Sequence, residues 1–135
     1  MICYGTLIAR ILLAFIFVFA GLSKIGKFAG TQQFMESTWH YWLGMAPLFL
    51  VAAIVFEIFG GLSVGLGYYT RAGAWLLIIF MIPVTLIFHT NFADPMQFIQ
   101  FMKNMAMTGG LIYVAAYGPG ELSLDHQRKK GATKP

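Results

Sequence analysis

Apolar residues fill most of the chain in four long stretches, which short polar segments separate. A bilayer core about 30 Å thick requires about 20 mostly apolar residues in helical conformation, and each stretch has that length. The pattern predicts membrane-spanning helices at about 4–26, 47–67, 71–92 and 98–118. We therefore predict an all-α integral membrane protein that forms one domain, 1–135, built as a four-helix bundle.

The connections and the basic residues predict how these helices are oriented. One longer segment, 27–46, follows the first stretch, whereas the other connections are short and make neighbouring helices antiparallel. Four spans place both termini on the same side of the membrane. The basic tail, 119–135, holds four of the nine Lys and Arg residues, and Arg71 lies in a turn on the same side. Positive residues favour the cytoplasm, so we predict cytoplasmic termini, although three lysines on the other side run against the rule.

Two segments have an alternative interpretation. Trp39, His40, Tyr41 and Trp42 in the longer connection are typical of the membrane–water interface, and an aromatic gate over a cavity is the alternative. Pro83 interrupts the third stretch, where it predicts either a structural kink or a kink beside a cavity.

Composition excludes most soluble classes. The chain is 59% apolar and 10% charged, against about 25% charged in ordinary soluble domains. Its net charge of +4 comes without a base-stacking aromatic surface, so we expect no nucleic-acid partner. A single cysteine, Cys3, excludes an internal disulfide, and the scattered histidines predict no metal site. No catalytic triad or phosphate loop is present, which excludes a soluble-type hydrolase or kinase.

Ionisable residues inside the spans mark the candidate site, because each costs about 3 kcal/mol or more in a membrane. Glu57 lies ten residues into its span, about 15 Å deep and near the midplane. Helical side chains lean toward the N-terminus, which favours Lys103, His89 or Asn104 as its neighbours and leaves Arg10 feasible. The candidate ligand-binding or proton-handling residues are Glu57, His89, Lys103, Asn104, Arg10 and Lys24.

Two interpretations of this polar group stay open. In the first, Glu57 pairs with a cation or a hydrogen-bond donor and only holds the helices together. In the second, the group lines a pocket that opens outward and binds the head of a lipophilic molecule such as a quinone, or passes a proton.

Small residues recur four positions apart, at Gly61 and Gly65 and at Ala106 and Gly110. Such pairs let helices approach closely. They predict tight helix packing, either within the chain or in a homo-oligomer.

An ordered series of residues along the chain resembles the DoxX family of small four-span bacterial membrane proteins, over about 10–125. The matching residues are Arg10, Phe-Ala-Gly-Leu-Ser-Lys at 19–24, Glu57, Gly60-Gly61, Gly67, Thr70-Arg71, His89, Lys103-Asn104, Gly109-Gly110, Gly118-Pro119-Gly120 and Ser123-Leu124-Asp125. The resemblance implies a multi-pass protein of the bacterial inner membrane. The family is named after a subunit of an archaeal thiosulfate:quinone oxidoreductase, and other members resemble partners in membrane oxidative-stress complexes.

Residues and resemblance together predict a membrane subunit whose pocket binds a quinone-like lipophile for a partner oxidoreductase. Glu57 would accept a proton or a hydrogen bond, Arg10 and Lys103 would balance its charge, and His89 would donate to a carbonyl oxygen. The chain lacks the cysteine pair of thiol-dependent quinone-linked relatives, which argues against that activity. It also lacks a soluble redox domain, so an oxidoreductase role would require a membrane or peripheral protein partner. The alternative is a non-catalytic assembly factor, chaperone or scaffold that presents small-residue grooves to client helices. Transport is a third function, which the absence of inverted repeats disfavours.

Overall fold

The computed structural model of this chain describes residues 2–38 and 44–132, which contain helices and turns but no strand. The helices are α1 (Ile2–Gly26), α2 (Phe28–Thr38), α3 (Ala46–Leu66), α4 (Thr70–Phe88), α5 (Pro95–Tyr117) and α6 (Leu124–Ala132). The all-α prediction is confirmed. The predicted interfacial rings at 39–42 lie outside the described residues.

Four of these helices coincide with the four apolar stretches. Three, namely Tyr4–Gly26 within α1, α3 and α4, are long and apolar enough to cross a membrane. The fourth, α5, has 23 residues but is less apolar because it carries Gln97, Gln100, Lys103 and Asn104. Its assignment as a fourth span stays a prediction, as does the cytoplasmic side of the termini.

Two short helices and the end of one long helix differ from the prediction. The segment 27–46 contains helix α2, and the basic tail contains helix α6, both too short to stand out as apolar stretches. Helix α4 ends at Phe88 rather than near residue 92, because the following segment turns to start α5. There the Asp94 side chain accepts a hydrogen bond from Met96 N, a common N-terminal cap.

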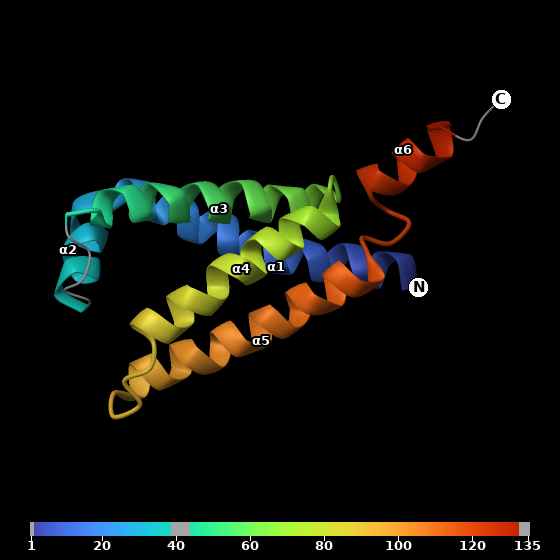
Figure 1. The fold of residues 1–135 in the computed structure, drawn as a ribbon. Coiled ribbons are helices and arrows are strands. Elements are labelled where there is room, and N and C mark those ends of the chain that lie inside the picture. The colour runs from blue at the N-terminus through green and yellow to red at the C-terminus, as the bar shows by residue number, and fades with distance from the viewer. Residues whose placement is uncertain (1, 39–43, 133–135) are drawn as a thin grey trace.

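The long helices pack against their neighbours in chain order, α1 on α3, α3 on α4 and α4 on α5 (Figure 1). Glycines allow the closest of these approaches. A Cβ at Gly61 would lie 2.8 Å from Val18 Cγ2, and one at Gly65 would lie 2.8 Å from Ala14 Cβ. Both glycines therefore contact α1 within the chain, as Gly110 does, facing the side chain of Leu13. Ala106, the remaining predicted packing residue, is exposed.

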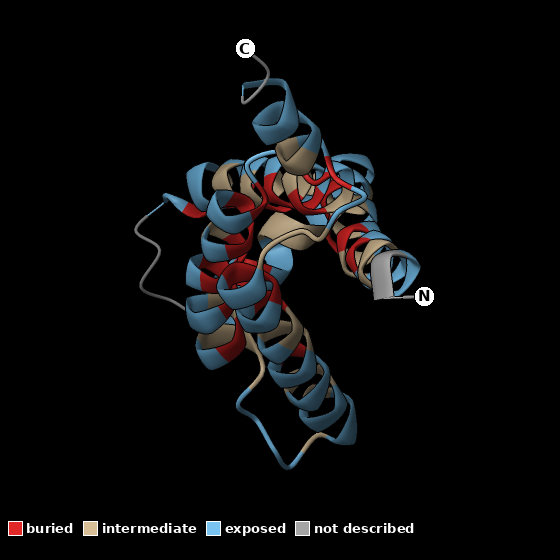
Figure 2. Cartoon of the chain, turned by 90° about the vertical axis from the view of Figure 1, so that its right-hand side faces the viewer, coloured by how far each residue is buried: buried red, intermediate tan, exposed pale blue. Residues whose placement is uncertain are grey.

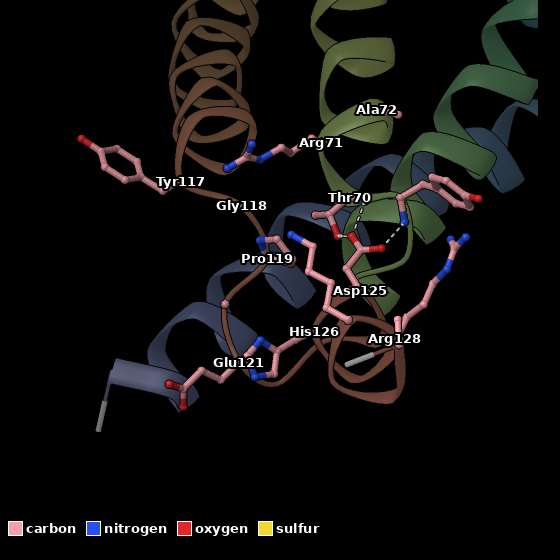
Figure 3. Close-up of a pocket in the computed structure, with 14 residues that line it drawn as sticks. Thr70, Arg71, Ala72, Tyr117, Gly118, Pro119, Glu121, Asp125, His126 and Arg128 are labelled. Atoms are coloured by element: carbon pink, nitrogen blue, oxygen red, sulfur yellow. Dashed lines mark hydrogen bonds between the residues drawn. The ribbon is translucent and has the colours of Figure 1, made fainter. Parts of the chain in front are cut away.

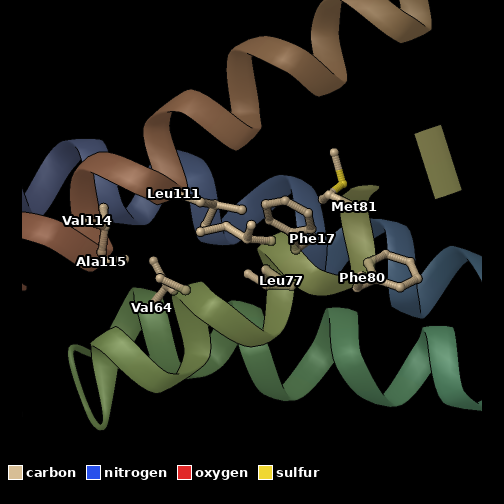
Figure 4. Close-up of a cluster of buried hydrophobic side chains, with 10 residues drawn as sticks. Phe17, Val64, Leu77, Phe80, Met81, Leu111, Val114 and Ala115 are labelled. Carbon is tan, nitrogen blue, oxygen red and sulfur yellow. The ribbon is translucent and has the colours of Figure 1, made fainter. Parts of the chain in front are cut away.

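An apolar core joins all four long helices (Figure 4). Phe17 of α1, Val64 of α3, Leu77 of α4 and Leu111 of α5 meet there, each nearly inaccessible. Outside the core, the helix faces expose large apolar side chains, and Phe15 of α1 is 67% exposed. Exposed residues cover the outside of the molecule in Figure 2, and an apolar outside of this kind is the surface that lipid covers.

The segment between α5 and α6 closes the end of the molecule where both termini lie (Figure 1). Arg10 of α1, 2% exposed, donates hydrogen bonds to the carbonyl oxygens of Val64 and Leu122. Its guanidinium occupies the place where a Cβ of Gly67 would be, so that position requires glycine. Gly67 also ends α3 with φ +71°, a left-handed conformation that glycine adopts without strain.

Asp125 of α6 caps the N-terminus of α4 (Figure 3). Its carboxylate accepts hydrogen bonds from Tyr69 N at 2.8 Å, Thr70 N at 2.9 Å and Thr70 Oγ1 at 2.8 Å. Partial burial alone would raise the pKa of Asp125, but these hydrogen bonds and the charge of Arg128 lower it below the ordinary value of 3.8. A chain segment distant in sequence therefore supplies the negative charge that a helix N-terminus favours.

We expect Asp125→Asn to lower the free energy of unfolding at neutral pH by about 1 kcal/mol, the usual cost of a lost cap. Because the pKa of Asp125 is lower in the folded state, the ionised carboxylate stabilises the fold above pH 4, approximately. That contribution is lost as the pH falls through the folded-state pKa. The free energies of unfolding of the wild type and of Asp125→Asn, measured in detergent, should therefore become equal at acid pH. A difference between them that is the same at every pH would contradict the capping role.

Candidate functional site

A cavity of about 610 Å³ lies among helices α1 to α5, on the side where α2 covers the molecule. We call it the inter-helix cavity. The α4–α5 hairpin diverges from the α1–α3 pair toward this side (Figure 1), and α2 contributes Thr31, Phe34 and Met35 to the wall. Most of the lining is apolar. The polar exceptions include Lys24, Glu57, His89, Gln100, Lys103 and Asn104.

An ion pair between α1 and α3 forms one wall of the cavity. Lys24 Nζ lies 2.8 Å from Glu57 Oε1 and 2.8 Å from Oε2. Gly21, one turn before Lys24, lets the two helices approach, because a Cβ there would lie 3.3 Å from Glu57 Cβ. The Glu57 side chain is 7% exposed, and Lys24 is its ion-pair partner within the described residues.

Two further polar contacts tie α4 to α5 beside the ion pair. Asn104 Nδ2 donates to Thr85 Oγ1 at 3.0 Å, and both residues are buried. His89 Nδ1 lies 2.8 Å from Gln97 Oε1. An amide oxygen only accepts, so Nδ1 donates and the neutral ring keeps Nε2 as an acceptor. Neutral His89 can therefore receive a hydrogen bond from a bound hydroxyl at Nε2.

Lys103 is the exposed cation of this group. Within residues 2–38 and 44–132 its ammonium has no hydrogen-bond or ion-pair partner, so all its donors face the cavity mouth or solvent. Pro83 and Ile79 of α4 line the same cavity. Pro83 has no N–H to give to the carbonyl of Ile79, so the helix has a weakened turn at the cavity wall.

The structure brings five of the six predicted site residues to one cavity and places the sixth elsewhere. Arg10 does not line the cavity but binds the carbonyl oxygen of Leu122 at the end that holds the termini. The expectation that Arg10 lies near Glu57 is wrong, because Arg10 meets α3 at Val64, seven residues further along. Glu57 pairs with Lys24, which leans back toward the N-terminus of α1 and hence toward Glu57. The role of these residues in binding stays a prediction.

Two polar residues of α5 were not among the predicted site residues, namely Gln100, which lines the cavity, and Gln97, the partner of His89. Gln97, Gln100 and Asn104 stand at helical spacing i, i+3 and i+7, so they share one face of α5. This polar face on an otherwise apolar helix was the signal that they meet a neighbour. The sequence indicated helix α2 more weakly, through two apolar residues two turns apart, Phe28 and Met35. In the structure both pack against α3.

The arrangement combines apolar walls with a few polar groups of opposite character. Lys24 and Lys103 are donors, whereas Glu57 and His89 Nε2 are acceptors. Across the described residues, no three His, Cys, Asp or Glu side chains gather in a metal-binding arrangement. Such a cavity is suited to a molecule with an apolar body and a head that carries oxygen atoms.

Comparison with known proteins gives two family matches. The DoxX family model matches residues 5–90, and the SURF4 family model matches residues 62–131. The chain is 38% identical over 126 residues to inner membrane protein YqjF of Escherichia coli strain K12, and the aligned region covers 93% of each chain. It is 35% identical over 128 residues to inner membrane protein YphA of the same strain, covering 90% of this chain and 88% of that protein. No solved structure matches.

Proposed function

This chain belongs to the DoxX family, and we propose that its inter-helix cavity binds the oxygen-bearing head of a lipophile such as a quinone for a partner oxidoreductase. Its relatives YqjF and YphA are inner membrane proteins by name, and three helices here are apolar enough to span a bilayer. The chain is a multi-pass inner-membrane protein, so its ligands reach it through lipid as well as through water.

One observation carries the proposal: a cavity of about 610 Å³ holds five polar site residues within apolar walls. Ligand pockets of about 300–1,000 Å³ usually have this composition, with a few polar groups that orient the ligand. If these polar residues only held the helices together, they would be expected to bond to one another and leave no cavity between them. Here Lys103 is exposed at the cavity, and the ion pair forms part of the cavity wall.

Each polar residue has a distinct task in this proposal. Lys24 and Lys103 would donate hydrogen bonds to carbonyl or phenolate oxygens of the head. Glu57 would hold a proton or accept a hydrogen bond, with Lys24 balancing its charge in place of Arg10. With Nδ1 bonded to Gln97, His89 would accept a hydrogen bond from a hydroxyl of the head at Nε2, in place of the predicted donation to a carbonyl oxygen. These residues bind, orient and hold protons, and the partner would supply or remove electrons.

The test is mass spectrometry of organic-solvent extracts from the detergent-purified protein, in the wild type and in Glu57→Gln. We expect the wild type to retain a lipophile near one per chain and the variant to lose most of it. The amide is nearly the same size as the carboxylate, but it cannot hold the charge that Lys24 faces.

Two further variants separate binding from folding. Glu36→Gln removes an exposed carboxylate of α2 that does not line the cavity, and it should retain the lipophile. Ala52→Phe places a ring in the cavity wall without replacing a polar group, and it should expel the lipophile from a folded protein. Bulk phospholipid alone in the wild type and every variant would contradict the proposal and favour an assembly factor or scaffold.

A further inference from the structure

Two polar side-chain pairs join α4 to α5, and both have the same relation to the inter-helix cavity. Asn104 pairs with Thr85, and His89 pairs with Gln97. In each pair one residue lines the cavity, namely Asn104 and His89, whereas its partner lies outside the lining. The α4–α5 hairpin (Figure 1) therefore presents two side chains to the cavity that are held from behind.

Asn104 presents its amide oxygen to the cavity. Its Nδ2 donates to Thr85 Oγ1 at 3.0 Å, so the nitrogen end of the amide is turned toward a residue outside the lining. Oδ1, at the other end of the amide, receives no hydrogen bond from the described residues. Asn104 is 6% exposed, and a buried acceptor without a donor costs free energy that a ligand with a donor would recover.

His89 and Glu57 add further acceptor atoms. His89 Nδ1 donates to Gln97 Oε1, so the neutral ring keeps a free lone pair at Nε2, which has no partner in the described part of the chain. The carboxylate oxygens of Glu57 accept from Lys24, and each keeps a second lone pair. The lining therefore holds acceptor atoms from three helices, α3, α4 and α5.

The donors of the same lining depend less on a ligand. Lys24 donates to Glu57, and its side chain is also 27% exposed. Lys103 is exposed, so water can satisfy its ammonium group. Gln100, which shares the face of α5 with Asn104, carries both donors and an acceptor and favours neither kind of ligand. The buried part of the lining therefore lacks a hydrogen-bond donor rather than an acceptor.

We infer that the inter-helix cavity binds the reduced, hydroxyl-bearing form of its lipophile, such as a quinol, in preference to the oxidised carbonyl form. A hydroxyl group can donate to Asn104 Oδ1 or to His89 Nε2, whereas a carbonyl oxygen there would meet a lone pair. A hydroxyl oxygen also accepts, so Lys24 and Lys103 remain usable as donors to it. The inference rests on the proposed function, because it concerns the same cavity.

Thr85 and Gln97 are positioning residues in this arrangement. Each bonds the cavity residue from outside the lining, and the geometry leaves an acceptor atom on the cavity side. Neither residue touches the ligand. Changing them should therefore alter which form of the ligand is preferred more than how much ligand the cavity can hold.

The test compares a decyl-substituted benzoquinone with its quinol under argon, with the full chain in detergent micelles. Affinity is read from the ligand concentration that gives half of the maximal rise in unfolding temperature. We expect the quinol to bind about tenfold more tightly, the effect of one buried acceptor left without a donor. Para-decylphenol and its methyl ether, which differ in the O–H donor and are stable in air, should show the same direction of preference.

Three variants locate the preference. Asn104→Leu removes the acceptor, so the affinity for the quinol should fall about tenfold while that for the quinone stays unchanged. Thr85→Val releases the amide of Asn104, which can then turn an N–H toward the cavity, so the preference for the quinol should shrink. Gln33→Leu removes an amide from an exposed residue of α2 outside the lining, and both affinities should be unchanged.

The outcomes separate this inference from the proposed function. No rise in unfolding temperature with either form would contradict both. Equal affinity for the two forms, or tighter binding of the quinone, would leave the proposed function in place and overturn the inference. An equal loss of quinol and quinone in Asn104→Leu would indicate a structural role and overturn the role given to Oδ1. The wild-type comparisons decide the preference even where Asn104→Leu fails to fold.

Discussion

Replacing Lys24 with methionine is expected to lower the free energy of unfolding by about 2–3 kcal/mol. Lys24 Nζ lies 2.8 Å from both carboxylate oxygens of Glu57, whose side chain is 7% exposed. Without the ammonium, the carboxylate must either stay charged among apolar side chains or take up a proton, and both cost free energy. Water reaches the Lys24 side chain, which is 27% exposed, so the loss should be smaller than for a fully buried pair. Denaturation of the purified protein by an ionic detergent measures it.

The double variant Lys24→Met, Glu57→Met shows whether that loss comes from the unpaired carboxylate. Removing both partners of a buried pair is often nearly neutral, so the double variant should recover to within about 1 kcal/mol of the wild type. Lys27→Met, three positions along the chain and exposed, should change stability by about 0.5 kcal/mol or less. If Lys24→Met costs no more than Lys27→Met, the ion pair does not stabilise the fold.

Gly61→Leu is expected to lower the free energy of unfolding by about 3 kcal/mol. The new Cβ alone would lie 2.8 Å from Val18 Cγ2 and 3.2 Å from the carbonyl oxygen of Ala14. A leucine therefore forces α1 away from α3, which also disturbs the Lys24–Glu57 pair further along the same two helices. The same ionic-detergent denaturation measures the loss, and the amount of folded protein recovered from membranes should fall with it.

Gly109→Leu is the matched control, because no atom outside its own helix lies within 4 Å of a Cβ at that position. Leucine is a better helix former than glycine, so this variant should be neutral or stabilised by about 0.5 kcal/mol. The comparison also tests the assembly-factor alternative. A client groove at Gly61 predicts loss of a partner from a protein that is still stable, whereas internal packing predicts loss of stability in the isolated chain.

The class of protein and the approximate positions of its long helices could be predicted from the amino-acid sequence. Apolar stretches of membrane length are a local property, and they remain visible whatever the helices pack against. The sequence also showed that Glu57 lies within such a stretch, where an ionisable side chain has a high free-energy cost. The polar residues His89, Lys103 and Asn104 were equally evident. The short helices α2 and α6 were not visible, because neither has an apolar stretch of its own.

Which of these residues contact one another could not be predicted from the sequence and is seen in the fold. Glu57 pairs with Lys24 because Gly21 lets α1 and α3 approach at that level, and Arg10 is occupied by the carbonyl oxygen of Leu122, more than a hundred positions away. Asp125 caps α4 in the same long-range manner. Such contacts depend on where helices cross and how closely they approach. A shift of one helical turn, about 5.4 Å, exchanges one partner for another, and no local pattern of residues encodes it.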